Sequence, residues 1–169
     1  MKKIAFRFLL LVVVALAGIS CKDDYVYSDL VQDNLPAVPV TYSGATTYGF
    51  DPYYETSIAG GGNIKITLSI PTSSGRTIKE ITRVAAGATS INAGTLNTAG
   101  NYNTGPIAGN GTTAEFTTTI KDFNTKRPAV PTTPTTPPTG VREIAFIFLV
   151  TLDDGTEIRT MPVRIRVLP

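Results

Sequence analysis

The C-terminal part of the chain constrains the fold most, because apolar residues alternate along it on both sides of one tight turn. Residues 141–152 place large apolar side chains at every second position, and many of the positions between them are apolar as well, which is typical of a central strand covered on both faces. Asp154 and Gly155 then predict a type I′ turn, which needs positive φ angles. Residues 157–168 return as a second strand, which Pro162 marks as an edge strand or a bulge. Its inward side chains are predicted to be Val163, Ile165 and Val167.

Other segments of the chain show similar strand signals. Residues 63–70 and 112–120 alternate between apolar and polar side chains, and residues 77–85 are a further candidate strand. A first edge strand is expected at residues 38–42, and one short strand at residues 91–96. No segment shows sustained helical periodicity. The sequence therefore predicts an all-β fold, an antiparallel β-sandwich.

A Pro/Thr-rich segment interrupts the strands at residues 128–140. Proline lacks the amide donor that helices and sheets need, so this segment can form neither. The chain after it is too short to fold alone, so the segment is not a domain boundary. We expect a long surface loop that carries the chain from one sheet or edge to another.

The N-terminus has the pattern of a secretory signal. Lys2, Lys3 and Arg7 precede thirteen uncharged residues, 8–20, which end at the only cysteine, Cys21. The apolar run is too short to span a bilayer, because a transmembrane helix needs about 20 apolar residues. Residues 1–20 are therefore predicted to be a signal peptide.

The sequence around Cys21 resembles that of bacterial lipoproteins, in particular those of the Bacteroidota. Gly18-Ile19-Ser20-Cys21 is similar to a relaxed lipobox, with Gly18 in place of the usual Leu, and Lys22, Asp23 and Asp24 resemble the export signal that follows it. The resemblance implies that Cys21 carries the lipid, that residues 21–40 form the lipidated cysteine and tether, and that the protein is anchored in the outer membrane facing the cell exterior. Alternatively, the three charged residues only solvate the start of the tether.

The body of the chain resembles immunoglobulin-like or fibronectin-type modules of such surface lipoproteins. The resemblance rests on the strand pattern from about Gly62 to Pro169, and the Cys-Trp-Cys signature of true immunoglobulin domains is absent. It implies one immunoglobulin-like β-sandwich over residues 41–169, with the Pro/Thr-rich loop inside it.

Composition argues against several functions. Three of the 15 basic residues lie in the predicted signal, so the mature chain would carry 12 basic and 13 acidic residues. Such a nearly neutral chain lacks the excess positive charge that binds the phosphates of nucleic acid. Histidine is absent, and the lipid would occupy the only thiol. The usual general base, nucleophile activator and transition-metal ligands are therefore missing together. We expect no enzyme activity, no cofactor and no metal site.

A tyrosine-rich stretch at residues 41–55 is the candidate binding surface. Tyr48, Tyr53 and Tyr54 could stack on the apolar faces of sugar rings and donate hydrogen bonds. The second interpretation is that several of these rings fill one end of the sandwich, because the chain has no tryptophan.

Charged residues in three places allow further interpretations. Calcium could bind the acidic hairpin tip at Asp153, Asp154 and Glu157, although such a turn needs no metal. The carboxylate pairs that a glycan hydrolase would need could be formed by Asp51 with Glu55 or by Glu115 with Glu143. The last strand carries three arginines that could guard an exposed edge, or face lipid phosphates or a partner: Arg159, Arg164 and Arg166.

Together these features predict a non-catalytic, surface-exposed outer-membrane lipoprotein. It would be a binding or accessory module for a polysaccharide or a protein partner. The alternative is a structural or assembly module that docks on a membrane complex by strand addition.

Overall fold

The computed structural model describes residues 37–48, 51–97, 101–134 and 140–169, which belong to one compact unit beginning at Pro36. The predicted signal peptide, the lipidation at Cys21 and the export signal at Lys22, Asp23 and Asp24 lie outside the described residues. No helix in the described part of the chain is long and apolar enough to cross a membrane.

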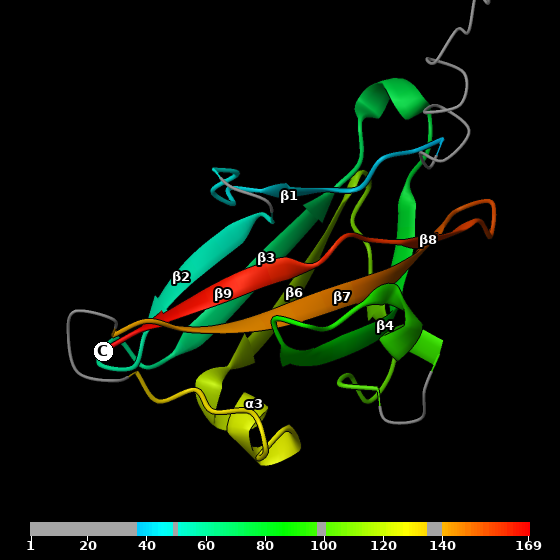
Figure 1. The fold of residues 1–169 in the computed structure, drawn as a ribbon. Helices are drawn as coiled ribbons and strands as arrows, with labels where there is room; N and C mark the ends of the chain where they lie inside the picture. The colour runs from blue at the N-terminus through cyan, green and yellow to red at the C-terminus, as the bar shows by residue number, and fades with distance from the viewer. Residues whose placement is uncertain (1–36, 49–50, 98–100, 135–139) are drawn as a thin grey trace, which may run out of the picture. The chain divides into compact units, whose positions relative to one another are not determined.

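Two β-sheets pack face to face, which confirms the predicted all-β sandwich (Figure 1). The first sheet has the strand order β1-β3-β6 and contains β1 (Thr41–Ser43), β3 (Asn63–Ser69) and β6 (Thr113–Thr119). The second sheet has the order β2-β9-β7-β4-β5, with β8 pairing to β7 beside that path. Its strands are β2 (Tyr53–Ser57), β4 (Ile78–Ala88), β5 (Ile107–Ala108), β7 (Arg142–Leu152), β8 (Glu157–Arg159) and β9 (Val163–Leu168). The predicted strands at 63–70, 77–85 and 112–120 are confirmed.

The central position predicted for residues 141–152 is confirmed. One face of β7 fills the space between the sheets with Ile144, Phe146, Phe148, Val150 and Leu152, all at most 1% exposed. On the other face, Ile147 and Leu149 are covered by Leu96 of the 3₁₀ helix η2 (Ala93–Asn97). The strand prediction for residues 91–96 is therefore wrong. A short turn of 3₁₀ helix places Leu96 over the apolar outer face of β7. A strand in this segment would instead have needed another strand for its main-chain hydrogen bonds.

Five aromatic rings form the centre of the core. Phe146 is fully buried, and its ring centroid lies 5.4 Å from that of Phe116, 5.5 Å from that of Tyr102 and 5.8 Å from that of Phe123. Phe148 packs against Phe116 at 5.4 Å between centroids. Such tilted and edge-on contacts add to the free energy of burying the rings.

The first and last strands differ from the prediction in their pairing. All neighbouring strands are antiparallel except β2 and β9, which run parallel from Tyr53 opposite Arg164 to Ser57 opposite Leu168. Since β9 lies between β2 and β7, it is not the edge strand that Pro162 suggests. The chain does break at that proline, which lies between β8 and β9. The inward set of β9 is confirmed, because Val163, Ile165 and Val167 are fully buried. The first strand lies at the edge of its sheet, but it covers residues 41–43 instead of 38–42.

The hairpin between β7 and β8 is not a type I′ turn. Gly155 has φ 85°, but Asp154 does not have a positive φ, because among the described residues only glycines do. The Gly155 N–H donates to the Leu152 carbonyl at 3.0 Å, and the Leu152 N–H donates to the Thr156 carbonyl at 2.9 Å. This is the geometry of a type I turn followed by a left-handed glycine in a three-residue loop.

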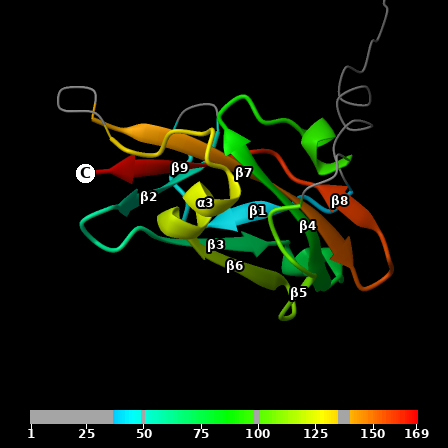
Figure 2. The same cartoon turned by 90° about the horizontal axis from the view of Figure 1, so that it is seen from below.

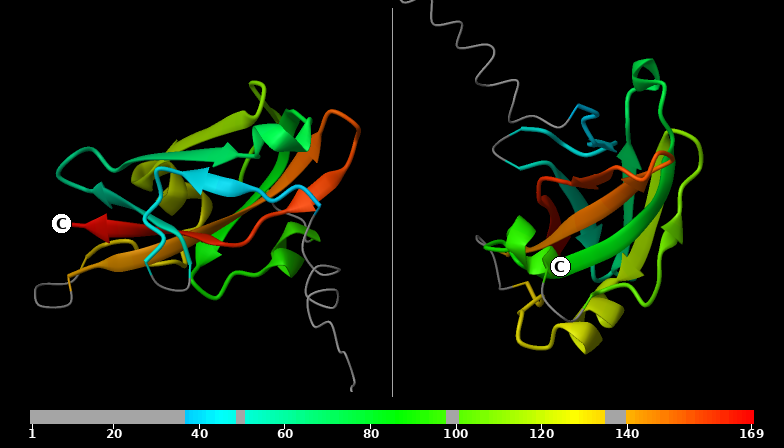
Figure 3. Two further views of the ribbon diagram at one scale, coloured as in Figure 1. Left: turned by 90° about the horizontal axis from the view of Figure 1, so that it is seen from above. Right: turned by 90° about the vertical axis from the view of Figure 1, so that its right-hand side faces the viewer.

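A short helix that the sequence pattern did not predict, α3 (Ile120–Lys126), follows β6 directly. The hydroxyl of Thr119 accepts a hydrogen bond from the Asp122 N–H at 3.0 Å, which caps the helix. Ile120 and Phe123 face the core and anchor the helix to it. Figure 3 shows α3 and the 3₁₀ turn η1 (Thr72–Ser74) at opposite ends of the sandwich.

The Pro/Thr-rich segment joins α3, beside the first sheet, to β7 in the second sheet. Residues 128–134 and 140 are in neither helix nor strand. Residues 135–139 lie outside the described residues, so the long surface loop expected at 128–140 stays a prediction.

Candidate functional site

The outer face of β2, β9 and β7 carries a cluster of charged side chains around one tyrosine. We call it the outer-face cluster, and it consists of Asp51, Tyr53, Glu143, Arg164 and Arg166. Strand register brings these residues together, since Tyr53 lies opposite Arg164 and Glu143 lies opposite Arg166. Alternate residues of β9 point inward to the core, so the two arginines point outward.

Ion pairs connect the four charged side chains of the cluster in a continuous row, Asp51–Arg164–Glu143–Arg166. Arg164 donates to Asp51 Oδ2 from Nη2 at 2.8 Å and to Glu143 Oε2 from Nη1 at 3.0 Å. Arg166 Nε donates to Glu143 Oε1 at 2.9 Å. The four charged side chains are between 21% and 37% exposed, so water screens them only in part. Partial burial opposes the charge on Arg164, but its hydrogen bonds to Glu143 and Asp51 outweigh that effect and raise its pKa.

The tyrosine of the cluster is held by a cation–π contact. The guanidinium carbon of Arg166 lies 3.7 Å from the centroid of the Tyr53 ring. Because Glu143 also binds Arg166, the ring, the guanidinium and the carboxylate hold one another in place on the half-exposed face of the sheet.

The three tyrosines singled out in the sequence lie in different surroundings. Tyr54 follows Tyr53 in β2 and therefore points to the inner face, where it packs against the core and its hydroxyl donates to the Ser43 carbonyl at 2.7 Å. Burial raises the pKa of Tyr54. Tyr48 is 89% exposed, on a loop that starts beside Tyr53, since Thr46 and Tyr53 exchange main-chain hydrogen bonds at 2.8 and 2.9 Å. The structure thus brings Tyr53 and the Tyr48 loop together and places Tyr54 on the opposite face. Ligand binding by these residues stays a prediction.

The carboxylates proposed for hydrolysis have other partners. Glu115 pairs with Lys65 on the outer face of the first sheet, whereas Glu143 lies on the outer face of the second sheet. These two carboxylates therefore do not converge. Asp51 is held by Arg164, and Glu55 is exposed on β2.

The acidic hairpin tip is tied to the start of β4. Asp153 Oδ1 accepts a hydrogen bond from the Thr77 N–H at 3.2 Å and pairs with Arg76 Nε at 3.2 Å, and Arg76 also pairs with Asp154. The hydrogen bond from Thr77, together with the charge of Arg76, lowers the pKa of Asp153. Two of the three carboxylates considered for calcium, Asp153 and Asp154, thus join the hairpin tip to the segment before β4. Among the described residues, no group of three or more acidic or cysteine side chains has the arrangement of a metal site.

Two of the three arginines on the last strands do not protect a free edge. Arg164 and Arg166 belong to the outer-face cluster on an interior strand, and Arg159 donates from Nη2 to Asn97 Oδ1 at 3.0 Å. The prediction of an edge guard fails for the two β9 residues, because β2 pairs with β9 and covers that edge.

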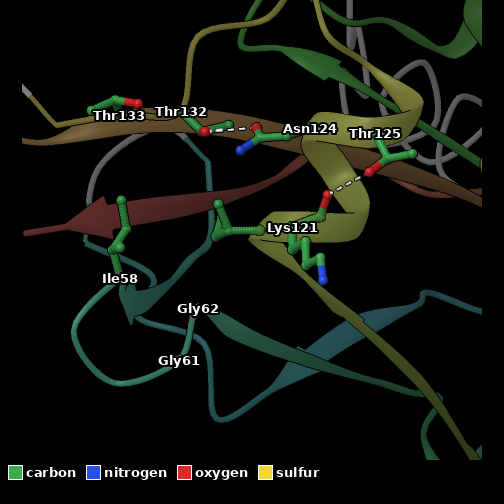
Figure 4. Close-up of a pocket in the computed structure, with 9 residues that line it drawn as sticks. Ile58, Gly61, Gly62, Lys121, Asn124, Thr125, Thr132 and Thr133 are labelled. Carbon is green, nitrogen blue, oxygen red and sulfur yellow. Dashed lines mark hydrogen bonds between the residues drawn. The ribbon is translucent and has the colours of Figure 1, made fainter.

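A pocket lies at one end of the sandwich, and we call it the end pocket (Figure 4). It has a volume of about 670 Å³ and lies between the β2–β3 turn, α3 and the start of the Pro/Thr-rich loop. Its lining is formed by Ile58, Gly61, Gly62, Ile120, Lys121, Asn124, Thr125, Thr132 and Thr133.

Sequence reasoning named every residue of the outer-face cluster, but it assigned them to separate features and did not connect Tyr53 with Arg164, Arg166 and Glu143. The alternation along residues 163–168 placed Arg164 and Arg166 outward, which was the available signal, but pairing with Asp51 and Glu143 depends on strand register. No family model, no curated protein and no solved structure matches this chain.

Proposed function

We propose that this protein is a non-catalytic lipoprotein of the outer-membrane surface whose sandwich binds a polysaccharide or a protein partner through the outer-face cluster. The observation that carries the proposal is the ordered arrangement of Tyr53, Arg166 and Glu143 on a half-exposed sheet face. The anchoring part of the proposal rests on Cys21 and its flanking residues.

The order of the cluster favours binding. Tyrosine and arginine are enriched among the residues that dominate binding interfaces. Here Arg166 and Glu143 already restrict the Tyr53 ring, so a partner loses little further side-chain entropy on contact. One face of the ring lies under Arg166, so the partner meets its edge, its hydroxyl and the neighbouring Tyr48 loop.

We also propose that the sandwich is immunoglobulin-like, and the strand order supports this. The order β1-β3-β6 corresponds to strands A, B and E of that fold, and β9-β7-β4 corresponds to G, F and C. In this comparison β5 takes the place of the strand that variable-type domains add beside C.

Replacement of Tyr53 by alanine is expected to weaken binding to the partner at least tenfold, because it removes both the ring and the surface that holds Arg166. The full chain, purified in detergent, is titrated first against a polysaccharide panel. Tyr54→Phe is the matched control, since it changes the neighbouring tyrosine on the inner face and should leave affinity unchanged.

Two results would contradict this proposal. Binding that survives Tyr53→Ala unchanged would show that the outer-face cluster is not the contact surface. Complete resistance of the sandwich to protease added to intact cells would contradict display on the exterior. If no polysaccharide binds, the same variants are tested against protein partners captured from the membrane fraction.

A second candidate, docking by strand addition, is favoured by the edge of β6, which lies at the margin of the first sheet (Figure 2). The Ile120 N–H donates to the Gly62 carbonyl at 2.8 Å, and the Ile70 N–H donates to the Thr112 carbonyl at 3.0 Å. The pairing of β3 with β6 between these two bonds is uninterrupted, and only every second residue of β6 bonds to β3. The main-chain groups of Glu115 and Thr117 therefore point away from β3. In the described part of the chain they have no main-chain partner.

Thr117→Pro tests strand addition, because it removes the outward N–H at a position where an edge strand tolerates proline. If the protein docks through β6, this variant should lose its partner complex in co-purification and keep its melting temperature within a few degrees. Thr118→Pro is the control for the fold, since its N–H faces β3 and its loss should destabilise the protein. Co-purification unaffected by Thr117→Pro would exclude docking at this edge.

A further inference from the structure

We propose that the end pocket binds an acidic saccharide, with the carboxylate of a uronic acid residue held by Lys121 and Asn124. The pocket shares no residue with the outer-face cluster. The inference rests on the proposed function in one respect, namely that the protein contacts a polysaccharide. It adds a second binding site besides the outer-face cluster and names the class of ligand.

The floor of the pocket is rigid main chain. Gly62 has φ 63°, and a Cβ atom there would lie 3.0 Å from Ile120 Cβ, so only glycine lets the β2–β3 turn approach α3 this closely. The Gly62 N–H donates to the Ser57 carbonyl at 2.9 Å, and the Gly62 carbonyl accepts from the Ile120 N–H at 2.8 Å. The turn and the helix are therefore fixed to each other without a ligand.

One side of α3 forms the wall. Lys121, Asn124 and Thr125 are spaced three and four residues apart, which places them on one helix face toward the pocket. The hydroxyl of Thr132, a residue that is only 3% exposed, donates to Asn124 Oδ1 at 2.7 Å. This bond involves the amide oxygen, so the Nδ2 group of Asn124 can still donate to a ligand. Figure 4 shows this group directed toward the space between the helix and Ile58.

The lining favours an anion that carries many oxygen acceptors. Lys121 has no ion pair with any described residue, and none of the residues that line the pocket is acidic. Its single ammonium matches one carboxylate charge, and the Asn124 amide contributes two N–H donors to the same pocket lining.

The remaining lining suits a sugar ring. The Thr125 hydroxyl donates to the Lys121 carbonyl at 3.0 Å, so its oxygen is left to accept from a sugar hydroxyl. Ile58 is 43% exposed and offers an apolar surface at the mouth of the pocket. A volume of about 670 Å³ lies within the range of small-molecule sites and has room for one or two sugar rings.

The test is a titration of the full chain in detergent with a uronate oligosaccharide and with its neutral analogue, in which each carboxyl group is reduced to the alcohol. We expect the uronate to bind at least tenfold more tightly than the analogue, and more weakly as salt is added. Lys121→Gln should reduce uronate affinity at least tenfold. Asn124→Asp should abolish binding, because it keeps the acceptor for Thr132 but places a carboxylate in the pocket.

Lys79→Gln is the matched control, since Lys79 is also an exposed lysine and lies on β4, outside the pocket. It should leave affinity unchanged, and a thermal melt of every variant checks the fold. Equal binding of uronate and neutral analogue would overturn the carboxylate assignment. Competition by acetate as effective as by the oligosaccharide would overturn the saccharide assignment.

Failure of this inference is distinguishable from failure of the proposed function. Uronate binding that is lost in Tyr53→Ala but kept in Lys121→Gln and Asn124→Asp would place the saccharide on the outer-face cluster and overturn the pocket assignment alone. No binding of any saccharide would also overturn it, while the protein-partner form of the proposed function would stand.

Discussion

Phe146→Ala is expected to lower the free energy of unfolding by about 3–5 kcal/mol, the range for truncating a buried phenylalanine. The ring is fully buried on β7 and contacts the rings of Tyr102, Phe116 and Phe123, with centroids 5.4 to 5.8 Å away. Phe116 lies on β6, Phe123 on α3 and Tyr102 in the loop before β5, so the cavity cannot close unless three separate segments move. Urea denaturation of the full chain measures the loss.

The matched control is Val141→Ala, a truncation of an apolar side chain that is 42% exposed just before the same strand. It should change stability by no more than about 0.5 kcal/mol, as surface substitutions usually do. A loss below about 1 kcal/mol for Phe146→Ala would mean that the aromatic core collapses into the vacated space and is less rigid than its contacts indicate.

Gly109→Ala is expected to cost about 3 kcal/mol, at the upper end of the range for overpacking. A Cβ atom at this position would overlap the main-chain carbonyl of Ile78. The Gly109 N–H donates to the Lys79 carbonyl at 2.9 Å, so the chain cannot move away from β4 without losing a main-chain hydrogen bond. The measurement is again urea denaturation, supported by the melting temperature.

Gly105→Ala is the control for this prediction, because a Cβ atom there would have no neighbour within 4 Å. It should be neutral or stabilising by up to about 1 kcal/mol, since alanine reduces the conformational entropy of the unfolded chain. Equal effects of the two alanine substitutions would show that the close approach of residue 109 to β4 does not limit stability.

The strands were predictable because a sheet with one buried face forces a period of two on the sequence. Residues 63–70 and 112–120 show that period, and β3 and β6 follow it within a residue. The continuous apolar stretch in residues 141–152 was predictable for the related reason that both faces of β7 are covered, one by the first sheet and one by Leu96.

The short helices were not predictable from periodicity, because α3 and η2 are too short to display it. The Thr119 cap with Asp122 three residues later was a local signal for α3. No local signal distinguishes η2 from a strand, since Leu96 is buried only because the outer face of β7 lies beneath it.

The candidate sites show a similar division. The aromatic stretch at residues 41–55 identified Tyr53 as a candidate for binding, but Asp51 and Arg164 are 113 residues apart in the chain and meet only through the parallel pairing of β2 with β9. The end pocket depends on Gly62, α3 and Thr132 meeting at one end of the sandwich. None of these residues stands out in the sequence.

The sequence was enough to predict that the described chain is an all-β sandwich, where β3, β4, β6 and β7 lie and which side chains of β7 and β9 face inward. These features were predictable because burial imposes a local pattern of apolar and polar residues. Three features became visible only in the folded chain: β2 runs parallel to β9, Tyr53 and Tyr54 face opposite surfaces, and Arg166 lies over Tyr53. Register and sheet order depend on pairing between segments that are distant in the chain. Because the main-chain N–H and carbonyl groups are the same in every strand, the local sequence does not specify which strand pairs with which.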